Sequence, residues 1–252
     1  MFHPDVSRGV HRLEHAHVNL YLIEDDDGIT VVDTGFPSTS GRIEKAVARI
    51  GRRVDDVQAV ILTHAHFDHV GSAKRLHERW HVPVWAHRDE KFLAAHPYRY
   101  RHERNRVLYP VRYPAGIPVL ARMTVAGALW VRGIEDVALF HTPDSRPTEP
   151  LDVPGRPVPV HTPGHTFGHC VLHLADRDTV IAGDAIVTLD PYTGRRGPQI
   201  VSGAATADSV TALASLTALA DTGATHLLPG HGEPWHGGVA AAVEQAVATG
   251  PS

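Results

Sequence analysis

The feature that most constrains this chain is a run of four metal-binding side chains within six residues, His64-Ala65-His66-Phe67-Asp68-His69. The run follows residues 57–62, a nearly continuous apolar segment that predicts a strand buried on both faces. Side chains two apart in an extended segment share a face, so His64 and His66 can bind one metal together. Asp68 and His69 lie where this strand gives way to a helix and can face a neighbouring position. The run therefore suits two adjacent metals.

Three downstream segments repeat this setting. His165, Asp184 and His231 each follow the end of a predicted strand, and each has a glycine neighbour. In sheet-based folds, functional sites assemble from loops at strand ends. A polar loop with solvated histidines would explain the first run but not this recurrence. We therefore predict one site that combines all seven side chains.

The remaining elements begin as a hairpin and later alternate between strands and helices, which predicts a mixed sheet arrangement covered by helices. The expected strands cover residues 17–24, 29–33, 57–62, 82–86, 137–140, 158–161, 169–174, 179–182 and 225–228. The expected helices cover 69–79, 205–220, 239–247 and a segment that starts at a Ser38 or Ser40 cap and ends at Gly51. Residues 142–159 carry six prolines and are expected to form a surface connection.

In these motifs the chain resembles the metallo-β-lactamase superfamily over most of its length. The family pattern of His-x-His-x-Asp-His, Gly-His, Gly-Asp and Gly-His-Gly is complete and in order here. The resemblance implies an α+β fold, a four-layer αββα sandwich, as a single domain over residues 1–252. It implies a first metal site of His64, His66 and His165, a second of Asp68, His69 and His231, and Asp184 as the bridge.

Imidazole and carboxylate ligands suit zinc, iron and manganese alike. We expect two divalent metal ions, with zinc as the default and iron or manganese as alternatives. Cys170 is the only cysteine, which excludes an internal disulfide and a thiolate-rich zinc cluster. Asp33 resembles an acidic family position that supports the ligands, and an Asp-Thr-Gly turn former is an equal alternative. His169 can likewise support a ligand.

The chain holds 20 histidines, and most are expected to lie outside the site. The helix-like spacing of His161, His165 and His169 does not make them one metal site, because Pro163 and Gly164 interrupt a helix there. Ordinary strand residues are expected at His161, His173 and His226. No ligand position is matched by His77, His81, His87, His96, His102, His141 or His236.

Two adjacent metals can share a hydroxide, because each lowers the pKa of bound water. The expected enzyme is a metal-dependent hydrolase in which this hydroxide attacks an ester-type bond of a small molecule and Asp68 orients it. No separate general acid is evident, which favours thioesters and lactones, whose leaving groups can depart as anions on a metal. The Asp184 position resembles the glyoxalase II and lactonase-like branch and disfavours a dedicated β-lactamase. The short segment after His231 disfavours the glutathione specificity of glyoxalase II.

Three other functions stay open. The first is a phosphodiesterase or nuclease-like hydrolase. The second is a mononuclear iron oxygenase that resembles persulfide dioxygenases, in which only two histidines and one aspartate bind metal. The third is a non-catalytic, metal-binding regulatory relative, which is disfavoured because all seven ligands are present. Tyr192 lies near Asp184, but its spacing differs from that of the lactonase tyrosine, so that role is not transferred.

Residues 88–132 interrupt the strand and helix alternation and predict a partly helical, lid-like insertion. Between Arg88 and Tyr113 this stretch holds seven basic residues and four tyrosines against three acidic residues. Arginines beside aromatic rings suit an anionic or aromatic substrate, and a solvated basic face is an equal alternative. The loop at 189–198 is expected to line the same pocket.

Composition excludes several other classes of protein. The formal net charge is -4, which does not suit a surface committed to nucleic acid. No stretch approaches the roughly 20 apolar residues that cross a bilayer, and the N-terminus lacks the features of a signal peptide. We therefore expect a cytoplasmic enzyme with a small-molecule substrate, without membrane or nucleic-acid partners.

Overall fold

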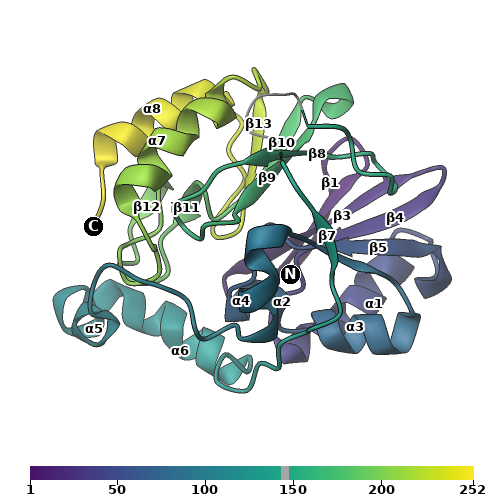
Figure 1. The fold of residues 1–252 in the computed structure, drawn as a ribbon, viewed down its shortest axis with the longest axis horizontal. Helices are drawn as coiled ribbons and strands as arrows, with labels where there is room; N and C mark the ends of the chain where they lie inside the picture. Colours follow the sequence, from purple (N-terminus) through teal and green to yellow (C-terminus); the bar gives the residue numbers. More distant parts are fainter. Residues whose placement is uncertain (143–147) are drawn as a thin grey trace.

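A computed structural model describes residues 1–142 and 148–252. Two β-sheets face each other, and helices cover their outer sides (Figure 1). The first sheet holds seven strands in chain order, β1 (Phe2–Ser7), β2 (Val10–His15), β3 (Val18–Asp25), β4 (Gly28–Val32), β5 (Val57–Ile61), β6 (Val84–His87) and β7 (Ala138–Phe140). Strands β1 to β4 pair antiparallel, whereas β4 to β7 pair parallel.

The second sheet has the order β13 (His226–Pro229), β10 (Thr179–Gly183), β9 (Cys170–Leu174) and β8 (Val158–His161). Strand β10 pairs parallel with β13 and antiparallel with β9. A two-stranded sheet of β11 (Val187–Leu189) and β12 (Arg196–Gln199) lies nearby. The parallel pairs matter for function, because they bring the carboxyl ends of several strands to the same edge.

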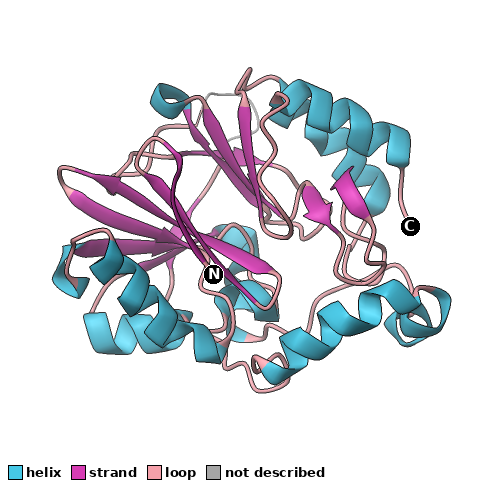
Figure 2. Cartoon of the chain, turned by 180° about the vertical axis from the view of Figure 1, so that it is seen from behind, coloured by secondary structure: helices cyan, strands magenta, loops and turns pink. Residues whose placement is uncertain are grey.

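Helices form the two outer layers (Figure 2). On the first sheet these are α1 (Ser40–Arg49) and α3 (Ala73–Trp80), and on the second they are α7 (Ser209–Ala220) and α8 (Val239–Thr249). The short helix α2 (Phe67–Val70) follows the first ligands. Residues 88–132, which we call the helical segment, contain α4 (Lys91–Ala95), α5 (Tyr109–Arg112), α6 (Ile117–Val125) and short 3-10 turns.

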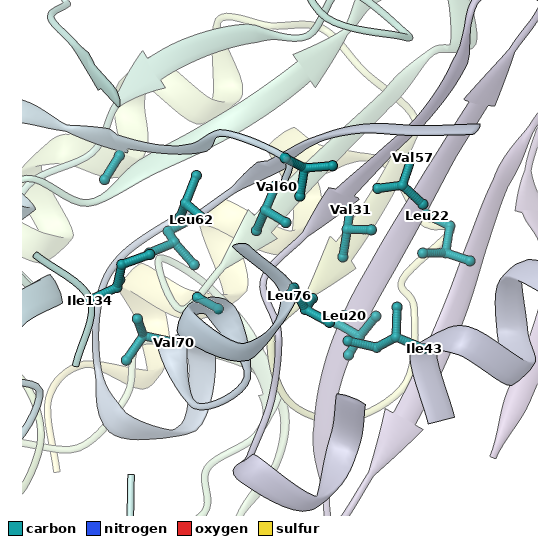
Figure 3. Close-up of a cluster of buried hydrophobic side chains, with 14 of the residues drawn as sticks. Leu20, Leu22, Val31, Ile43, Val57, Val60, Leu62, Val70, Leu76 and Ile134 are labelled. Atoms are coloured by element: carbon teal, nitrogen blue, oxygen red, sulfur yellow. The ribbon is translucent and has the colours of Figure 1, made fainter. Parts of the chain in front are cut away.

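Side chains that alternate along the strands produce three stacked cores. In β3, Leu20 and Leu22 pack toward α1 and α3, whereas Tyr21 and Ile23 pack between the sheets. In β10, Val180 packs toward α7 and α8 and its neighbours alternate in the same way. Figure 3 shows the first of these cores between the sheet and its helices. Both faces of the central strands are therefore apolar, which explains their nearly continuous hydrophobic sequences.

The predicted hairpin, the buried strand and the later strands are confirmed, as is the four-layer α+β fold. The predicted helix at 69–79 is wrong in detail, because the chain breaks between α2 and α3. At this break the Gly71 N–H donates to the Gly35 carbonyl, and any side chain on Gly71 would collide with that backbone. The strands β1 and β2 were not predicted.

The expected serine caps of α1 are also wrong. Ser38 donates its hydroxyl to the Ala126 carbonyl, and the residue before the helix, Thr39, makes no side-chain cap. The expected proline-rich connection at 142–159 falls partly on residues 143–147, outside the described residues, and its last two residues belong to β8. Among the described residues, no helix is long and apolar enough to cross a membrane.

Candidate metal centre

The seven predicted ligands meet at the edge between the two sheets, on loops that leave the ends of strands. The segment 64–69 follows β5 in the first sheet, whereas His165, Asp184 and His231 follow β8, β10 and β13 in the second. All seven residues are at most 5% exposed. The structure therefore collects in one buried place side chains that lie far apart in the sequence, because strand ends converge there.

Their ligand atoms form overlapping triads. Three groups each bring one ligand atom per residue within 4.8 Å of the others: His64, His66 and His165; Asp68, His69 and His231; and His64, His69 and Asp184. In the first group, His165 Nε2 lies 3.0 Å from His66 Nδ1. Asp184 spans the groups, because its Oδ1 is 3.5 Å from His69 Nε2 and its Oδ2 is 3.5 Å from His165 Nε2. The triads agree with the ligand sets that the family resemblance implies.

Several of these atoms are buried without a hydrogen-bond partner among the residues that the structure describes. They are His64 Nε2, His66 Nε2, His69 Nε2, His231 Nε2 and Asp184 Oδ1. An orphaned buried polar atom is costly, and proteins retain such atoms where a ligand satisfies them. Three of them, His64 Nε2, His69 Nε2 and His231 Nε2, lie 3.3 to 3.9 Å from an oxygen of the Asp184 carboxylate, so the site fits divalent cations bound by imidazole and carboxylate.

The opposite nitrogens of the ligand rings are held from outside the centre. His69 Nδ1 lies 2.9 Å from Asp33 Oδ2, and His231 Nδ1 lies 2.8 Å from the His17 carbonyl oxygen. His64 Nδ1 meets the Thr63 hydroxyl at 3.1 Å. A metal-binding histidine usually donates its second N–H in this way, which fixes the ring and leaves the other nitrogen free to bind.

Asp33 acts on the centre through two residues. Its carboxylate accepts from the Thr63 N–H at 2.9 Å and the Thr63 hydroxyl at 2.8 Å, in addition to its contact with His69. Asp33 also has a φ of 61°, a left-handed conformation that costs free energy in a non-glycine residue. These contacts favour the supporting role over the simple turn former.

His169 supports the bridging position. Its Nε2 accepts a hydrogen bond from the backbone N–H of Asp184 at 3.0 Å, and its Nδ1 lies 2.8 Å from the Thr162 hydroxyl. Burial holds the pKa of His169 at about 3, which keeps Nε2 available as an acceptor. The residue therefore orients the Asp184 backbone.

Glu90, which was not predicted from sequence, links the segment of His64 and His66 to the segment that follows His165. Its carboxylate accepts from the Ala65 N–H at 2.8 Å and the Gly168 N–H at 2.9 Å, and its side chain is fully buried. Burial raises its pKa, and the hydrogen bonds oppose that rise. The position of Glu90 at the start of α4, far from any ligand motif, gave no sequence signal of this role.

Packing explains why the residue before His231 is a glycine, Gly230. A side chain there would collide with Asp184 Oδ1 and would approach His69 Cε1 to 2.9 Å. The Gly-His-Gly sequence around His231 therefore lets the backbone pass against two other ligands.

Charge is concentrated in this buried site. Burial opposes ionisation of Asp184, but His231 and His69 outweigh it and hold the pKa of the carboxyl well below its ordinary value. Burial lowers the pKa of His69, yet Asp184, Asp33 and Asp68 raise it to about 9. Desolvation, followed by neighbouring histidines, holds the pKa of His64 well below its ordinary value. The carboxylates therefore attract positive charge to the centre, which favours the binding of divalent cations.

A cavity of about 220 Å³ opens beside His165. Its walls include Phe92, Arg99 and Arg101 from the helical segment and Phe167 from the loop after β8. A cavity of about 530 Å³ lies between α3 and Trp130 and contains none of the seven ligands. The smaller cavity is therefore the one placed to bind a substrate at the metal centre.

Two tyrosines reach this region from separate segments. The Tyr100 ring packs on the His66 ring at a centroid distance of 4.1 Å, and its hydroxyl lies 3.4 Å from that of Tyr192. Arg106 donates to the Tyr100 hydroxyl at 3.1 Å. Burial raises the pKa of both phenols, so both are neutral hydrogen-bonding groups. The predicted loop at 189–198 is wrong at both ends, where its residues belong to β11 and β12, and the turn between these strands contacts the helical segment through Tyr192.

Comparisons with known proteins identify the same family. The profile of the metallo-beta-lactamase superfamily matches residues 15–231. A relative from Bacillus subtilis (strain 168), the probable metallo-hydrolase YflN, is 30% identical over 250 residues, which cover 92% of this chain and 87% of YflN. The probable metallo-hydrolase YybB of the same organism is 27% identical, over 68% of this chain and 63% of YybB.

Solved structures share the fold. A metallo-beta-lactamase family protein from Thermus thermophilus aligns with a TM-score of 0.65 at 24% identity and covers 94% of this chain and 78% of that protein. A metallo-beta-lactamase from Cronobacter sakazakii, a variant of its HARLDQ motif, aligns with a TM-score of 0.66 at 18% identity and covers 97% of this chain and 93% of that one. At these identities the likeness concerns the fold alone.

Proposed function

The chain belongs to the metallo-β-lactamase superfamily, and from that premise we propose a dinuclear metal-dependent hydrolase that cleaves an ester-type bond in a small molecule. The observation that carries the proposal is the pair of buried triads joined by Asp184, with orphaned imidazole nitrogens inside them. His64, His66 and His165 would hold one metal, and Asp68, His69 and His231 the other. Zinc is the default occupant.

Divalent metals in these positions would supply a nucleophilic water at neutral pH and would polarise the bond under attack. The protein's own residues then orient the reactants. Asp68 Oδ2 lies 3.4 Å from His231 Nε2, and its carboxylate can accept a hydrogen bond from an attacking water. Burial opposes its ionisation, but His69 and His231 keep its pKa below the ordinary value, so Asp68 is an acceptor at neutral pH.

The chemistry of the leaving group favours a thioester or a lactone as the substrate. Asp68 is held as an anion, and the phenols of Tyr100 and Tyr192 have raised pKa values, so none of these groups is a strong acid. Thiolates and alkoxides that depart as anions need the least protonation. We therefore rank thioesters and lactones above amides.

The cavity beside His165 supports a substrate with an apolar and an anionic part. Phe92, Leu93 and Phe167 supply apolar wall, whereas Arg99 and Arg101 supply positive charge. Guanidinium groups bind carboxylate and phosphate groups with defined geometry. We propose that the helical segment is an insertion in a single domain and that its role is to select the substrate.

A phosphodiester substrate is the second candidate, since the same arginines suit phosphate. The mononuclear iron oxygenase is disfavoured because both triads are complete and buried, where that class would need only two histidines and one aspartate. The regulatory relative is disfavoured by the same completeness.

Activity screening tests the proposal. Zinc-replete protein would be assayed on thioesters, lactones, phosphodiesters and β-lactams, with Asp184→Asn as the variant and Asp221→Asn, at an exposed position, as the matched control. We expect hydrolysis of a thioester or lactone that only Asp184→Asn abolishes. Failure of all four classes at full metal content would refute the hydrolase. One iron and no zinc per chain by elemental analysis would favour the oxygenase.

A further inference from the structure

A second group of metal-binding side chains lies outside the seven-residue centre. His87 ends β6, Asp89 follows it, and His161 ends β8 in the other sheet. One ligand atom from each lies within 4.8 Å of the others. The His87 and His161 rings stack at a centroid distance of 4.8 Å with an interplanar angle of 22°. Sequence spacing gave no reason to join these residues, because the contact depends on how the sheets face each other.

The hydrogen bonds of the two rings assign their protons. His161 Nε2 lies 2.9 Å from the Phe167 carbonyl oxygen, which can only accept, so Nε2 carries the proton and Nδ1 has a free lone pair. His87 Nδ1 accepts from the Asp89 backbone N–H at 3.3 Å, so its proton is on Nε2, which faces the Thr142 hydroxyl at 3.2 Å. Nε2 of each ring is therefore protonated and each Nδ1 carries the lone pair, as in metal-binding histidines, and an ion on His87 Nδ1 would replace the 3.3 Å hydrogen bond from the Asp89 N–H.

Charge favours a cation at this place. Burial, followed by the neighbouring His161, lowers the pKa of His87 to about 4, so its ring is neutral at physiological pH. Asp89 Oδ2 lies 3.7 Å from His87 Nδ1, which is not a salt bridge while the ring is neutral. The other oxygen, Oδ1, lies 3.6 Å from Arg88 Nε. One carboxylate oxygen therefore faces the unprotonated nitrogen without a charged partner there, and Asp89 is 45% exposed, which gives a cation access from solvent.

We propose that His87, Asp89 and His161 form a separate site for one divalent transition-metal ion of the zinc class. Two imidazoles and one carboxylate suit zinc, nickel or copper and do not suit magnesium or calcium, which prefer oxygen ligands. The site does not depend on the proposed hydrolase activity.

The position of this site gives the ion a structural consequence. Asp89 and Phe167 also line the cavity beside His165, and Glu90, which follows Asp89, holds the Ala65 and Gly168 N–H groups. A cation bound between the end of β6 and the end of β8 would hold these two segments at a fixed distance. Occupancy of this site would therefore affect the shape of the cavity beside His165.

Zinc binding at equilibrium tests the site. Full-length protein would be dialysed against a series of buffered free zinc concentrations, and bound zinc would be counted by elemental analysis. The variants are His161→Ala and Asp89→Asn. The matched control is His226→Ala, because His226 Nδ1 lies 3.0 Å from His236 Nδ1 and represents another histidine pair nearer the surface. Circular dichroism would confirm that each protein is folded.

We expect both variants to bind one zinc ion per chain fewer than wild type at the free zinc concentration that fills the third site, and His226→Ala to bind as wild type does. Asp89→Asn decides the matter if His161→Ala does not fold. Unchanged stoichiometry in either folded variant, or an equal loss in His226→Ala, would overturn the site. The outcome is independent of the hydrolase proposal, because the count concerns an ion beyond the central pair.

Discussion

The seven ligands of the metal centre are at most 5% exposed, whereas the helical segment exposes Val107, Leu108, Val111 and Val125 by more than 60% each. The two regions also differ in charge. Residues 88–132 hold nine basic and three acidic side chains in a chain whose formal net charge is -4. The centre instead gathers carboxylates and imidazoles around the proposed positions for cations. In the proposed function, the first region determines the reaction and the second selects the substrate.

The two regions also differ in how far sequence predicts them. At the centre, His64, His69 and His231 are each held twice, by the segment after the strand that carries them and by an outer partner, which is Asp33 for His69. In the helical segment, α5 has four residues and α6 has nine, and few side chains of either helix are buried. Side chains that are held by many contacts keep the fixed geometry that a reaction needs. Side chains that are held by few contacts can be replaced, so the substrate specificity can vary.

The largest expected effect comes from Asp184→Asn. The amide keeps the shape but loses the negative charge that faces His69, His165 and His231. Residues that merely hold a ligand typically cost about 10- to 100-fold when removed, so loss of the bridge should lower kcat by more than about 100-fold. Elemental analysis measures the bound metal, and initial rates measure kcat. Near wild-type rates would show that one metal suffices.

Glu90→Gln should have the next largest effect. Glutamine offers only one acceptor oxygen, so either the Ala65 or the Gly168 N–H would face an NH2 group. We expect zinc affinity to fall by about 10- to 100-fold, as measured by competition with a chelator. The matched control is Glu78→Gln on the exposed face of α3. Equal affinities in the two variants would mean that Glu90 does not position the ligands.

Glu90 also marks the limit of what sequence could predict. The grouping of the seven proposed ligands was predictable because short motifs place them directly after strands, and their order matches the family. Glu90, His87 and His161 were not, because their roles arise from contacts between segments up to 78 residues apart, such as Glu90 with Gly168. The helix break at Gly71 was missed for the same reason, since it depends on the Gly35 backbone.

In the metal-free protein, acid should lower the free energy of unfolding through the buried histidines of the centre and not through the helical segment. Burial lowers the pKa of His66 to about 4, below the value of about 6.5 expected in the unfolded chain. Between these values the unfolded chain binds the proton and the folded protein does not, so the free energy of unfolding falls as pH falls through this window. The arginines of the helical segment stay charged throughout and contribute no such dependence.

Urea denaturation of the chelated protein at pH 7, 6 and 5 measures this dependence. His66→Gln removes one titrating group, so its slope should be smaller than that of wild type by up to about 1.4 kcal/mol per pH unit. His15 and His87, whose pKa values are also lowered to about 4 by burial, account for part of the remaining slope. Identical slopes in the two proteins would show that His66 is not buried as a neutral ring.

The smallest expected effect tests the helical segment itself. Arg101 lines the cavity beside His165, whereas Arg112 ends α5 and does not line it. For a substrate that carries an anionic group, Arg101→Ala should raise KM by about tenfold, equivalent to about 1.4 kcal/mol, and leave kcat nearly unchanged. A neutral analogue of the same shape should show no such loss, because it has no charge for the guanidinium to bind. Arg112→Ala should leave KM unchanged for both substrates. If the two arginine variants behave alike, the basic residues form a solvated face, and specificity must come from the apolar wall of Phe92, Leu93 and Phe167 instead.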